Sequence, residues 1–299
     1  MLNQQNRRAV ERRLHERISD IQWLIGGISS NVYAIQTETN QQYIIRLYDK
    51  SERDDVVEEV IQETRSLKEL VGLSQMIPEY IISETDCVQF TEPMLMMTKV
   101  DGEVIIEPED VHAWVEGLAK ALVAIHSLPI KDFPYTYFPY QDYEKFQSPK
   151  WSQYQDEWTY AIHLLKQGFP QVEYQFIHRD YHPNNVLWKD GEVTGVVDWV
   201  NACMGPAQID IGHCRVNLIQ LFNEAVADEF LSNYMEYTNQ PFDYDPRWDL
   251  ITLTDILFEP IEVYDGWVDL GVHHLTNEII KQKLDSYFYS TIHKMINQQ

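Results

Sequence analysis

The sequence is short of cysteine, of glycine and of positive charge. Its 299 residues include three Cys, 12 Gly and 13 Pro. The cysteines Cys87, Cys203 and Cys214 are odd in number and have no C-x-x-C spacing, which argues against a disulfide framework and a thiolate zinc site. We expect them to be small apolar core residues of an intracellular, cytoplasmic protein.

Long apolar runs are also missing. No uncharged stretch approaches the ~20 residues that a membrane-spanning helix needs, and no apolar segment follows the arginine-rich first twenty residues. The sequence therefore predicts neither a membrane span nor a secretory signal. Low-complexity stretches are absent and aromatic residues make up 12% of the chain, which favours an ordered fold over disorder.

Acidic residues dominate the charge. The chain has 23 Lys and Arg against 47 Asp and Glu, a formal net charge of −24. A nucleic-acid backbone or an anionic membrane surface would be repelled, so neither is expected as a partner. The charge is compatible with a cationic ligand, with a metal-bridged anion or simply with solubility. The oligomeric state stays open between monomer and homodimer.

Hydrophobic periodicity separates a strand-rich first hundred residues from a mostly helical remainder. Val10, Leu14 and Ile18 recur every four residues and predict an amphipathic helix. A helical pattern also covers residues 54–71. Runs of β-branched and aromatic residues predict strands at 23–25, 32–35, 43–47, 80–82 and 94–98, and short later ones at 176–177, 186–188 and 193–197.

The segment His178–Trp188 carries the most chemical information. It reads as a polar loop between two apolar strands, and it places Asp180 and Asn185 on rigid support. Asp198 ends the next apolar strand. One carboxylate can orient or deprotonate an acceptor hydroxyl, while an amide oxygen and a second carboxylate can hold Mg²⁺ against nucleotide phosphates. This arrangement predicts phosphoryl transfer from ATP.

The pattern H-x-D-x-x-x-x-N, followed by an apolar strand and D-W, resembles the aminoglycoside phosphotransferase family, the small-molecule branch of the protein-kinase-like fold. The resemblance implies that Asp180 is the catalytic base, that Asn185 and Asp198 bind Mg²⁺, and that His178 braces the loop. It also implies an α+β, bilobal protein-kinase-like fold. Residues 1–98 would form a small antiparallel-sheet nucleotide-binding lobe, and residues 99–299 a mostly helical catalytic and acceptor-binding lobe.

Two further segments extend the resemblance. Gly205–Asp210 is similar to the family's G-D-P-A-x-D segment, which implies that Asp210 hydrogen-bonds the catalytic-loop backbone, although Gln208 and the missing Asp after Gly205 depart from it. Arg46 stands where the family has a strand lysine that pairs with a helix glutamate. A guanidinium can still bridge phosphate and carboxylate. The resemblance implies contacts to ATP or GTP from the hairpin residues Gly27, Ser29 and Ser30, from Arg46 and Glu63, and from the hinge-strand residue Met97.

The tripeptide His178–Asp180 also reads H-R-D, as in protein kinases. However, Tyr181-His182-Pro183 replaces Leu-Lys-Pro, Val200 replaces the Gly of D-F-G, and no A-P-E segment follows. A small-molecule acceptor is therefore favoured over a protein. A kinase-like binding module without catalysis is disfavoured because the base and both metal ligands are present.

The acceptor is the least determined element. Residues 224–269 contain twelve acids and one base, Arg247. A cleft of one sign would concentrate a cationic acceptor such as an aminoglycoside. We expect most of these acids to form a solvated helix face, and Glu259, Glu262 and Asp265, which lie among aromatic residues, to face a cavity and the acceptor. Choline or ethanolamine, homoserine, and a sugar or nucleoside remain alternatives.

Two other groups of residues are expected to be structural. The aromatic-rich stretch 133–160 could stack on an acceptor but more often packs an insertion onto its domain. The histidines have no spacing typical of a transition-metal site, and we treat them as structural. They are His112, His126, His163 and His182.

Overall fold

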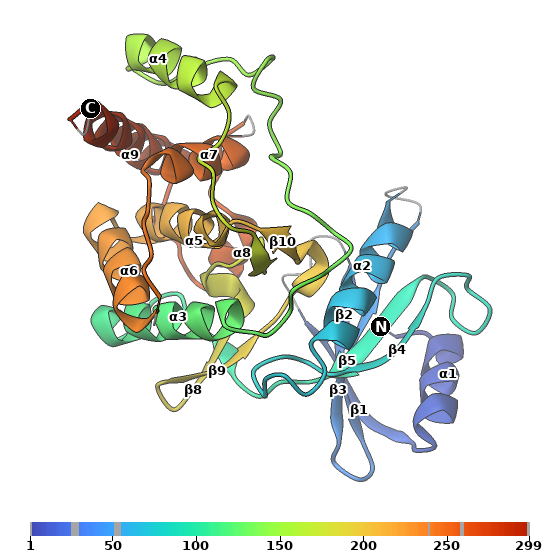
Figure 1. The fold of residues 1–299 in the computed structure, drawn as a ribbon. Coiled ribbons are helices and arrows are strands. Elements are labelled where there is room, and N and C mark those ends of the chain that lie inside the picture. The colour runs from blue at the N-terminus through green and yellow to red at the C-terminus, as the bar shows by residue number, and fades with distance from the viewer. Residues whose placement is uncertain (1, 25–29, 51–54, 239, 258–259, 298–299) are drawn as a thin grey trace. The chain divides into compact units, whose positions relative to one another are not determined.

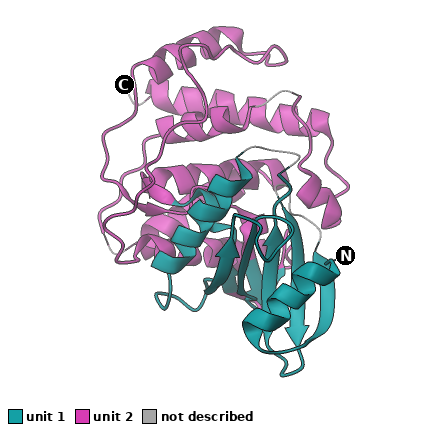
Figure 2. Cartoon of the chain, turned by 90° about the vertical axis from the view of Figure 1, so that its right-hand side faces the viewer, with its two compact units in different colours: residues 1–103, 187–190, 194–202 teal, residues 104–186, 191–193, 203–299 magenta. Residues whose placement is uncertain are grey.

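The computed structural model describes residues 2–24, 30–50, 55–238, 240–257 and 260–297. These residues form two compact units (Figure 2). Unit 1 comprises Met1–Glu103, Leu187–Asp190 and Thr194–Ala202, and unit 2 comprises Val104–Val186, Gly191–Val193 and Cys203–Gln299. Unit 1 thus extends to residue 103 and includes two later segments. The division of the chain into two lobes at residue 98 stays a prediction.

Unit 1 is built on a five-stranded antiparallel sheet with the order β1-β2-β3-β5-β4 (Figure 1). Every strand expected in this part of the chain is present, and Met94–Thr98 has the expected bounds. The strands are β1 (Ile18–Leu24), β2 (Asn31–Thr37), β3 (Gln42–Leu47), β4 (Tyr80–Glu84) and β5 (Met94–Thr98). The register pairs Arg46 with Val32 on one side and Leu95 on the other, so Arg46 lies in the middle of the sheet.

Two helices accompany this sheet. Helix α1 (Gln4–Leu14) buries Ala9 and Val10 in the core of unit 1, and helix α2 (Val56–Glu69) matches the expected helix over 54–71. The expectation that Ile18 belongs to the N-terminal helix is wrong. His15 adopts a left-handed conformation with φ 56° and ends α1, so Ile18 instead begins β1 and packs in the same core as Val10.

The segment that carries Asp198 folds with the sheet of unit 1. Strands β8 (Val186–Lys189) and β9 (Glu192–Val196) are hydrogen-bonded neighbours, and β6 (Glu103–Val104) pairs with β8. The Val196 N–H donates to the Met76 carbonyl oxygen (2.8 Å). Gly102 has φ 131°, and a Cβ there would lie 2.4 Å from Thr194 Oγ1, so this turn requires glycine. The short 3₁₀ helix η2 (Trp199–Asn201) follows Asp198 directly.

Unit 2 is mostly helical. Its helices are α3 (Val111–His126), α4 (Gln155–Lys166), α5 (Ala207–Leu221), α6 (Glu224–Tyr237), α7 (Arg247–Ile256), α8 (Asp265–Asp269) and α9 (Asn277–Asn297). Helix α5 is buried along almost its whole length and packs against α6, α7 and α9. Strands β7 (Gln175–Ile177) and β10 (Cys203–Gly205) form a two-stranded antiparallel sheet, and the 3₁₀ helix η1 (Pro183–Asn185) lies between β7 and β8. Within the ranges described, none of the helices has the length and apolar character needed to cross a bilayer.

Candidate active site

The loop after β7 is held from beneath by Asp210. This residue lies in the first turn of α5 and is fully buried. Its carboxylate accepts hydrogen bonds from the backbone N–H of His178 (2.8 Å) and of Arg179 (2.6 Å), and it also contacts His126 Nε2 (3.0 Å). Two backbone donors on one buried carboxylate fix the direction in which the chain leaves the strand. The hydrogen bond expected from Asp210 to the loop backbone is therefore present.

Asp180 presents its carboxylate at the end of this braced loop. Oδ1 lies 3.3 Å from His213 Nε2 and 3.8 Å from His182 Nε2, and the side chain is 30% exposed. Burial acts to raise the pKa of Asp180, but the hydrogen bond with His213 and the charges of the neighbouring histidines outweigh it and lower the pKa well below its usual range. Asp180 is therefore a partly accessible carboxylate that stays ionised at neutral pH.

Asn185 is oriented by the same loop. Its Nδ2 donates to the Asp180 carbonyl oxygen (2.9 Å) and lies 3.4 Å from Asp180 Oδ2. Both contacts are made by the amide nitrogen, so neither of them uses the amide oxygen. The neighbouring Asn184 accepts a hydrogen bond from Trp267 Nε1 (2.8 Å), which ties η1 to α8.

Arg179 and a buried acid support the outer side of the loop. Arg179 has φ 66°, and its guanidinium donates to the Phe138 carbonyl oxygen (2.7 Å) while lying over the Phe138 and Tyr140 rings. Asp255, at the end of α7, accepts from the Tyr140 N–H (3.2 Å), and burial raises the pKa of Asp255 to about 6. Part of the aromatic-rich stretch 133–160 thus packs on the loop after β7.

The second cluster lies in unit 1 around Arg46. Its Nη1 donates to Glu63 Oε1 (3.0 Å) and Oε2 (2.9 Å) and to Asp198 Oδ1 (2.8 Å), and Nε donates to Ser30 Oγ (3.1 Å). Tyr48 also donates to Glu63 (3.0 Å). The predicted pairing of Arg46 with Glu63 is present. The contacts of Arg46 with Asp198 and with Ser30 were not predicted.

Burial and charge act in opposite directions in this cluster. Burial would lower the pKa of Arg46, but the charges of Asp198 and Glu63 raise it well above its usual value. Burial raises the pKa of Glu63, although the Arg46 charge opposes that rise. Asp198 has φ 67°, a left-handed conformation that a non-glycine residue adopts at an energetic cost, and it is held by the Arg46 contact.

The remaining nucleotide-site residues are placed as follows. Met97 lies in β5, 5% exposed, paired with Ile44 and Tyr80. Gly27 and Ser29 lie outside the described residues, so the hairpin prediction there stays untested. In unit 1, Arg46 Nη1 contacts Oδ1 of Asp198, and in unit 2 the Asn185 amide nitrogen is hydrogen-bonded to the loop. A carboxylate oxygen and an amide oxygen are both ligand types that a hard cation prefers.

Six of the twelve acids in the segment 224–269 pair with other groups of the chain. Arg215, 1% exposed, pairs with Asp228 (2.9 Å) and Asp249 (2.9 Å), and Lys294 pairs with Glu224 (2.7 Å). Three more acids have partners; these are Glu229 with His112, Asp245 with Arg247, and Asp255 with the Tyr140 N–H. Glu262 and Asp265 are exposed, and Glu259 lies outside the described residues.

The structure adds two histidines to the site. His213 touches the Asp180 carboxylate, and His182, which we expected to be structural, lies beside both. His213 follows Asp210 by three residues on α5, so both side chains lie on the same side of that helix. Asp210 was predicted to contact the catalytic loop, and that spacing could have identified His213.

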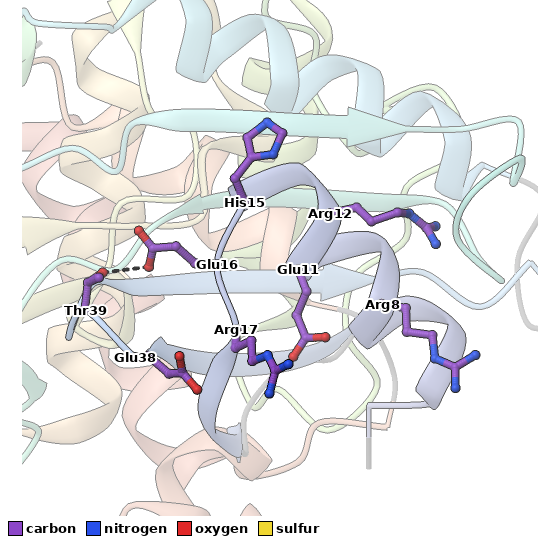
Figure 3. A pocket seen from close by; sticks show the side chains of 8 residues that line it. All are labelled: Arg8, Glu11, Arg12, His15, Glu16, Arg17, Glu38 and Thr39. Carbon is purple, nitrogen blue, oxygen red and sulfur yellow. Dashed lines mark hydrogen bonds between the residues drawn. The ribbon is translucent and has the colours of Figure 1, made fainter.

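A surface hollow in unit 1 is unrelated to these clusters. It lies between α1 and the turn that joins β2 to β3, and its walls carry both signs of charge (Figure 3). The lining residues are Arg8, Glu11, Arg12, His15, Glu16, Arg17, Glu38 and Thr39. None of the predicted site residues within the described ranges is among them.

Similarity to known proteins agrees with this geometry. A curated relative, the aminoglycoside 3′-phosphotransferase of Enterococcus faecalis, is 25% identical over 186 residues, which span 55% of this chain and 66% of that protein, just under two thirds of its length. A solved structure from Ralstonia eutropha, described as an aminoglycoside phosphotransferase, has a TM-score of 0.68 at 15% identity, covering 96% of this chain and 98% of that one.

A second solved structure is a thermostable mutant of the aminoglycoside phosphotransferase APH(4)-Ia in a ternary complex with AMP-PNP and hygromycin B. It has a TM-score of 0.62 at 15% identity and covers 97% of this chain and 98% of that one. At these identities the two structures show a common fold, the protein-kinase-like one. The model of the phosphotransferase enzyme family APH matches residues 20–248. The chain therefore belongs to the APH phosphotransferase enzyme family.

Proposed function

We propose that the protein transfers the γ-phosphoryl group of ATP to a hydroxyl of a small, amine-bearing molecule in the cytoplasm. The observation that carries the proposal is Asp180: an ionised, partly exposed carboxylate on a loop whose backbone is fixed by Asp210. Family membership supports the reaction class.

Asp180 acts on the acceptor hydroxyl. One carboxylate oxygen faces His213, and the carboxylate orients the hydroxyl towards the γ-phosphorus and accepts its proton. The new bond joins the acceptor oxygen to phosphorus, the bond from phosphorus to the β–γ bridging oxygen breaks, and ADP leaves. A carboxylate with a lowered pKa is a weak base, so Asp180 serves chiefly by positioning and takes the proton late in the transfer.

Arg46 contributes to nucleotide binding. Glu63 holds its guanidinium through both carboxylate oxygens, and Ser30 accepts from Nε, so the side chain has little freedom. A planar guanidinium so fixed keeps a permanent positive charge for the nucleotide phosphates, as a strand lysine does in other members of the fold. GTP presents the same phosphates. The choice between ATP and GTP depends on how β5, around Met97, contacts the adenine or guanine ring.

Mg²⁺ completes the proposed site. Asn185 and Asp198 would hold it, because an amide oxygen and a carboxylate oxygen are the ligands that this hard cation prefers. When bound, Mg²⁺ neutralises charge on the nucleotide phosphates. The chain's own part is to keep these two oxygens available: the Asn185 amide nitrogen is bound to the loop, and Arg46 takes only one oxygen of Asp198.

A cationic acceptor is favoured by charge. The chain carries a net charge of −24, and Glu262 and Asp265 are exposed in the segment proposed to line the acceptor site. Solved structures of similar fold are complexes with hygromycin B and with kanamycin, which supports an aminoglycoside-like acceptor here. Six other acids of that segment already pair with groups of the chain. Fewer acids are therefore available to bind a cationic acceptor than the composition of the segment suggests.

The test is phosphorylation of an acceptor panel. The full-length protein with MgATP is incubated with aminoglycosides, choline, ethanolamine, homoserine and uncharged sugars, and products are identified by mass spectrometry as acceptors that gain one phosphoryl group. We expect an aminoglycoside-like polyamine to be phosphorylated, and Asp180→Asn to abolish the product. Transfer only to an uncharged acceptor would overturn the cationic assignment. If the Asp180→Asn variant still transfers the phosphoryl group, the assignment of Asp180 as the base is wrong.

A further inference from the structure

The two histidines at Asp180 form, with that carboxylate, a three-donor cluster within unit 2. Asp180 Oδ1, a ring nitrogen of His182 and a ring nitrogen of His213 lie within 4.8 Å of one another. The donors come from three places in the fold: the loop after β7, the residue that precedes η1, and the second turn of α5. This cluster shares no ligand with the magnesium site proposed for Asn185 and Asp198, although Asn185 Nδ2 contacts Asp180.

The spacing of these donors suits a small tetrahedral cation. Zinc is bound by imidazole nitrogen and carboxylate oxygen at about 2.0–2.2 Å, so tetrahedral ligand atoms lie about 3.3–3.5 Å apart. The His213–Asp180 distance of 3.3 Å already meets this value, and the His182–Asp180 distance of 3.8 Å exceeds it by a few tenths of an ångström. The two ring nitrogens lie within 4.8 Å of each other, so the donors must approach one another a little further to bind one cation.

The chemistry of the donors selects the metal. Two imidazoles and one carboxylate favour a borderline transition cation over Mg²⁺, which prefers oxygen ligands and keeps its waters. Three protein ligands leave the fourth tetrahedral position for water, as in open zinc sites. The side chains of Asp180 and His213 are 30% and 21% exposed, so a cation can reach the cluster from solvent.

We propose that Asp180, His182 and His213 form a binding site for Zn²⁺ that is separate from the magnesium site. Zinc in this site would coordinate Asp180 Oδ1, the oxygen that faces His213, and would draw the carboxylate away from the acceptor hydroxyl. Zinc is therefore an inhibitor of phosphoryl transfer that competes with the acceptor and not with the nucleotide. This consequence rests on the proposed function, whereas the binding of zinc does not.

The test measures binding without nucleotide or acceptor. Co²⁺ replaces Zn²⁺ as a spectroscopic probe, because tetrahedral Co²⁺ absorbs visible light far more strongly than octahedral Co²⁺, and Zn²⁺ is then added to displace it. We expect one equivalent to bind the wild-type protein with a tetrahedral spectrum. The affinity should fall at least tenfold in His213→Gln and in His182→Gln. His163→Gln, which changes an exposed histidine on α4, is the matched control and should bind as the wild type does.

Three results would overturn the site. They are the absence of saturable one-equivalent binding to the wild type, equal affinity in the two histidine variants and the control, and displacement of the probe by an equal concentration of Mg²⁺. Circular dichroism of each variant distinguishes the loss of a ligand from the loss of the fold, and the two histidine variants give independent answers. Because no phosphoryl transfer is measured, a failure of the proposed reaction would leave this result unaffected.

Discussion

The cluster around Arg46 and the cluster around Asp180 hold carboxylates in opposite ways. In unit 1 a permanently charged guanidinium bridges Glu63 and Asp198, and the Glu63 side chain is 1% exposed. In unit 2 the Asp180 carboxylate is partly exposed and held by imidazoles, whose charge depends on pH. The first arrangement suits a permanent scaffold for phosphates. The second suits the role proposed for Asp180, which is to orient an acceptor hydroxyl and to take its proton late in the transfer.

The scaffold character of the Arg46 cluster gives the largest expected effect. Glu63→Gln removes the carboxylate that receives Arg46 Nη1 through two oxygens, and a buried charge then loses its principal partner. Breaking a buried pair in this way costs about 3–5 kcal/mol. We expect the free energy of unfolding, measured by urea denaturation, to fall by that amount.

Glu69→Gln is the matched control for that experiment. Glu69 is an exposed glutamate at the end of the same helix, α2, and such surface changes are usually within about 0.5 kcal/mol. If both variants lose the same small amount of stability, the Arg46 cluster is not the scaffold described here.

The metal assignment in the same cluster gives the next effect. Asp198→Ala should lower the affinity for MgATP at least about tenfold, because it removes a proposed Mg²⁺ ligand. Calorimetric titration with ATP, with and without Mg²⁺, measures this: the wild type should bind more tightly with Mg²⁺, and the variant should not. Equal MgATP affinity in the two proteins would remove Asp198 from the metal site.

The burial of Asp255 gives a pH-dependent change in the free energy of unfolding, of similar or smaller size than the effects above. The pKa of Asp255 is raised from its usual 3.8 to about 6, so the folded protein holds a proton there that the unfolded chain releases. Stability from this group is therefore present below pH 3.8 and declines as pH rises towards about 6. We expect the free energy of unfolding of Asp255→Asn to rise by about 1–3 kcal/mol relative to that of the wild type between pH 4 and pH 8.

Urea unfolding of wild type and Asp255→Asn at a series of pH values tests this expectation. The difference in the free energy of unfolding should change in favour of the variant as pH rises. A difference that stays constant with pH would show that Asp255 is ionised throughout, in the manner of Asp180.

The exposed acids give the smallest effect. Glu262→Gln should raise the KM for a cationic acceptor by about 1.4- to 5-fold, the equivalent of the 0.2–1 kcal/mol of an exposed ion pair, and the effect should fade as salt increases. Glu229→Gln, whose carboxylate already pairs with His112, should leave the KM unchanged. A neutral acceptor whose KM ignores salt and both substitutions would leave the acidic segment as a solubility feature.

The contrast between regions also shows what the sequence could predict. The contacts of Asp210 with the loop backbone and of Arg46 with Glu63 follow from motifs whose residues have a fixed spacing. The strands of unit 1 follow from their β-branched runs. Ile18 was assigned to the wrong element because its spacing from Val10 and Leu14 suits a helix, whereas the left-handed turn at His15 is invisible in that pattern.

The acidic segment could not be interpreted from its own composition. Three of its twelve acids pair with cations that lie outside the segment: Asp228 and Asp249 with Arg215, and Glu224 with Lys294. Only the packing of α5, α6, α7 and α9 brings them together. The same packing places His213 at Asp180. These contacts depend on how distant helices pack, and a local sequence pattern does not predict them.

The most direct test of the central claim compares phosphoryl transfer and nucleotide binding in wild type and Asp180→Asn. In a single turnover with MgATP and the acceptor identified by the panel, we predict that the rate of transfer falls about 10²–10⁴-fold in the variant, while the Kd for MgATP stays unchanged. A transfer rate equal to that of the wild type, with the same acceptor and the same nucleotide affinity, would contradict the assignment of Asp180 as the base on which this account depends.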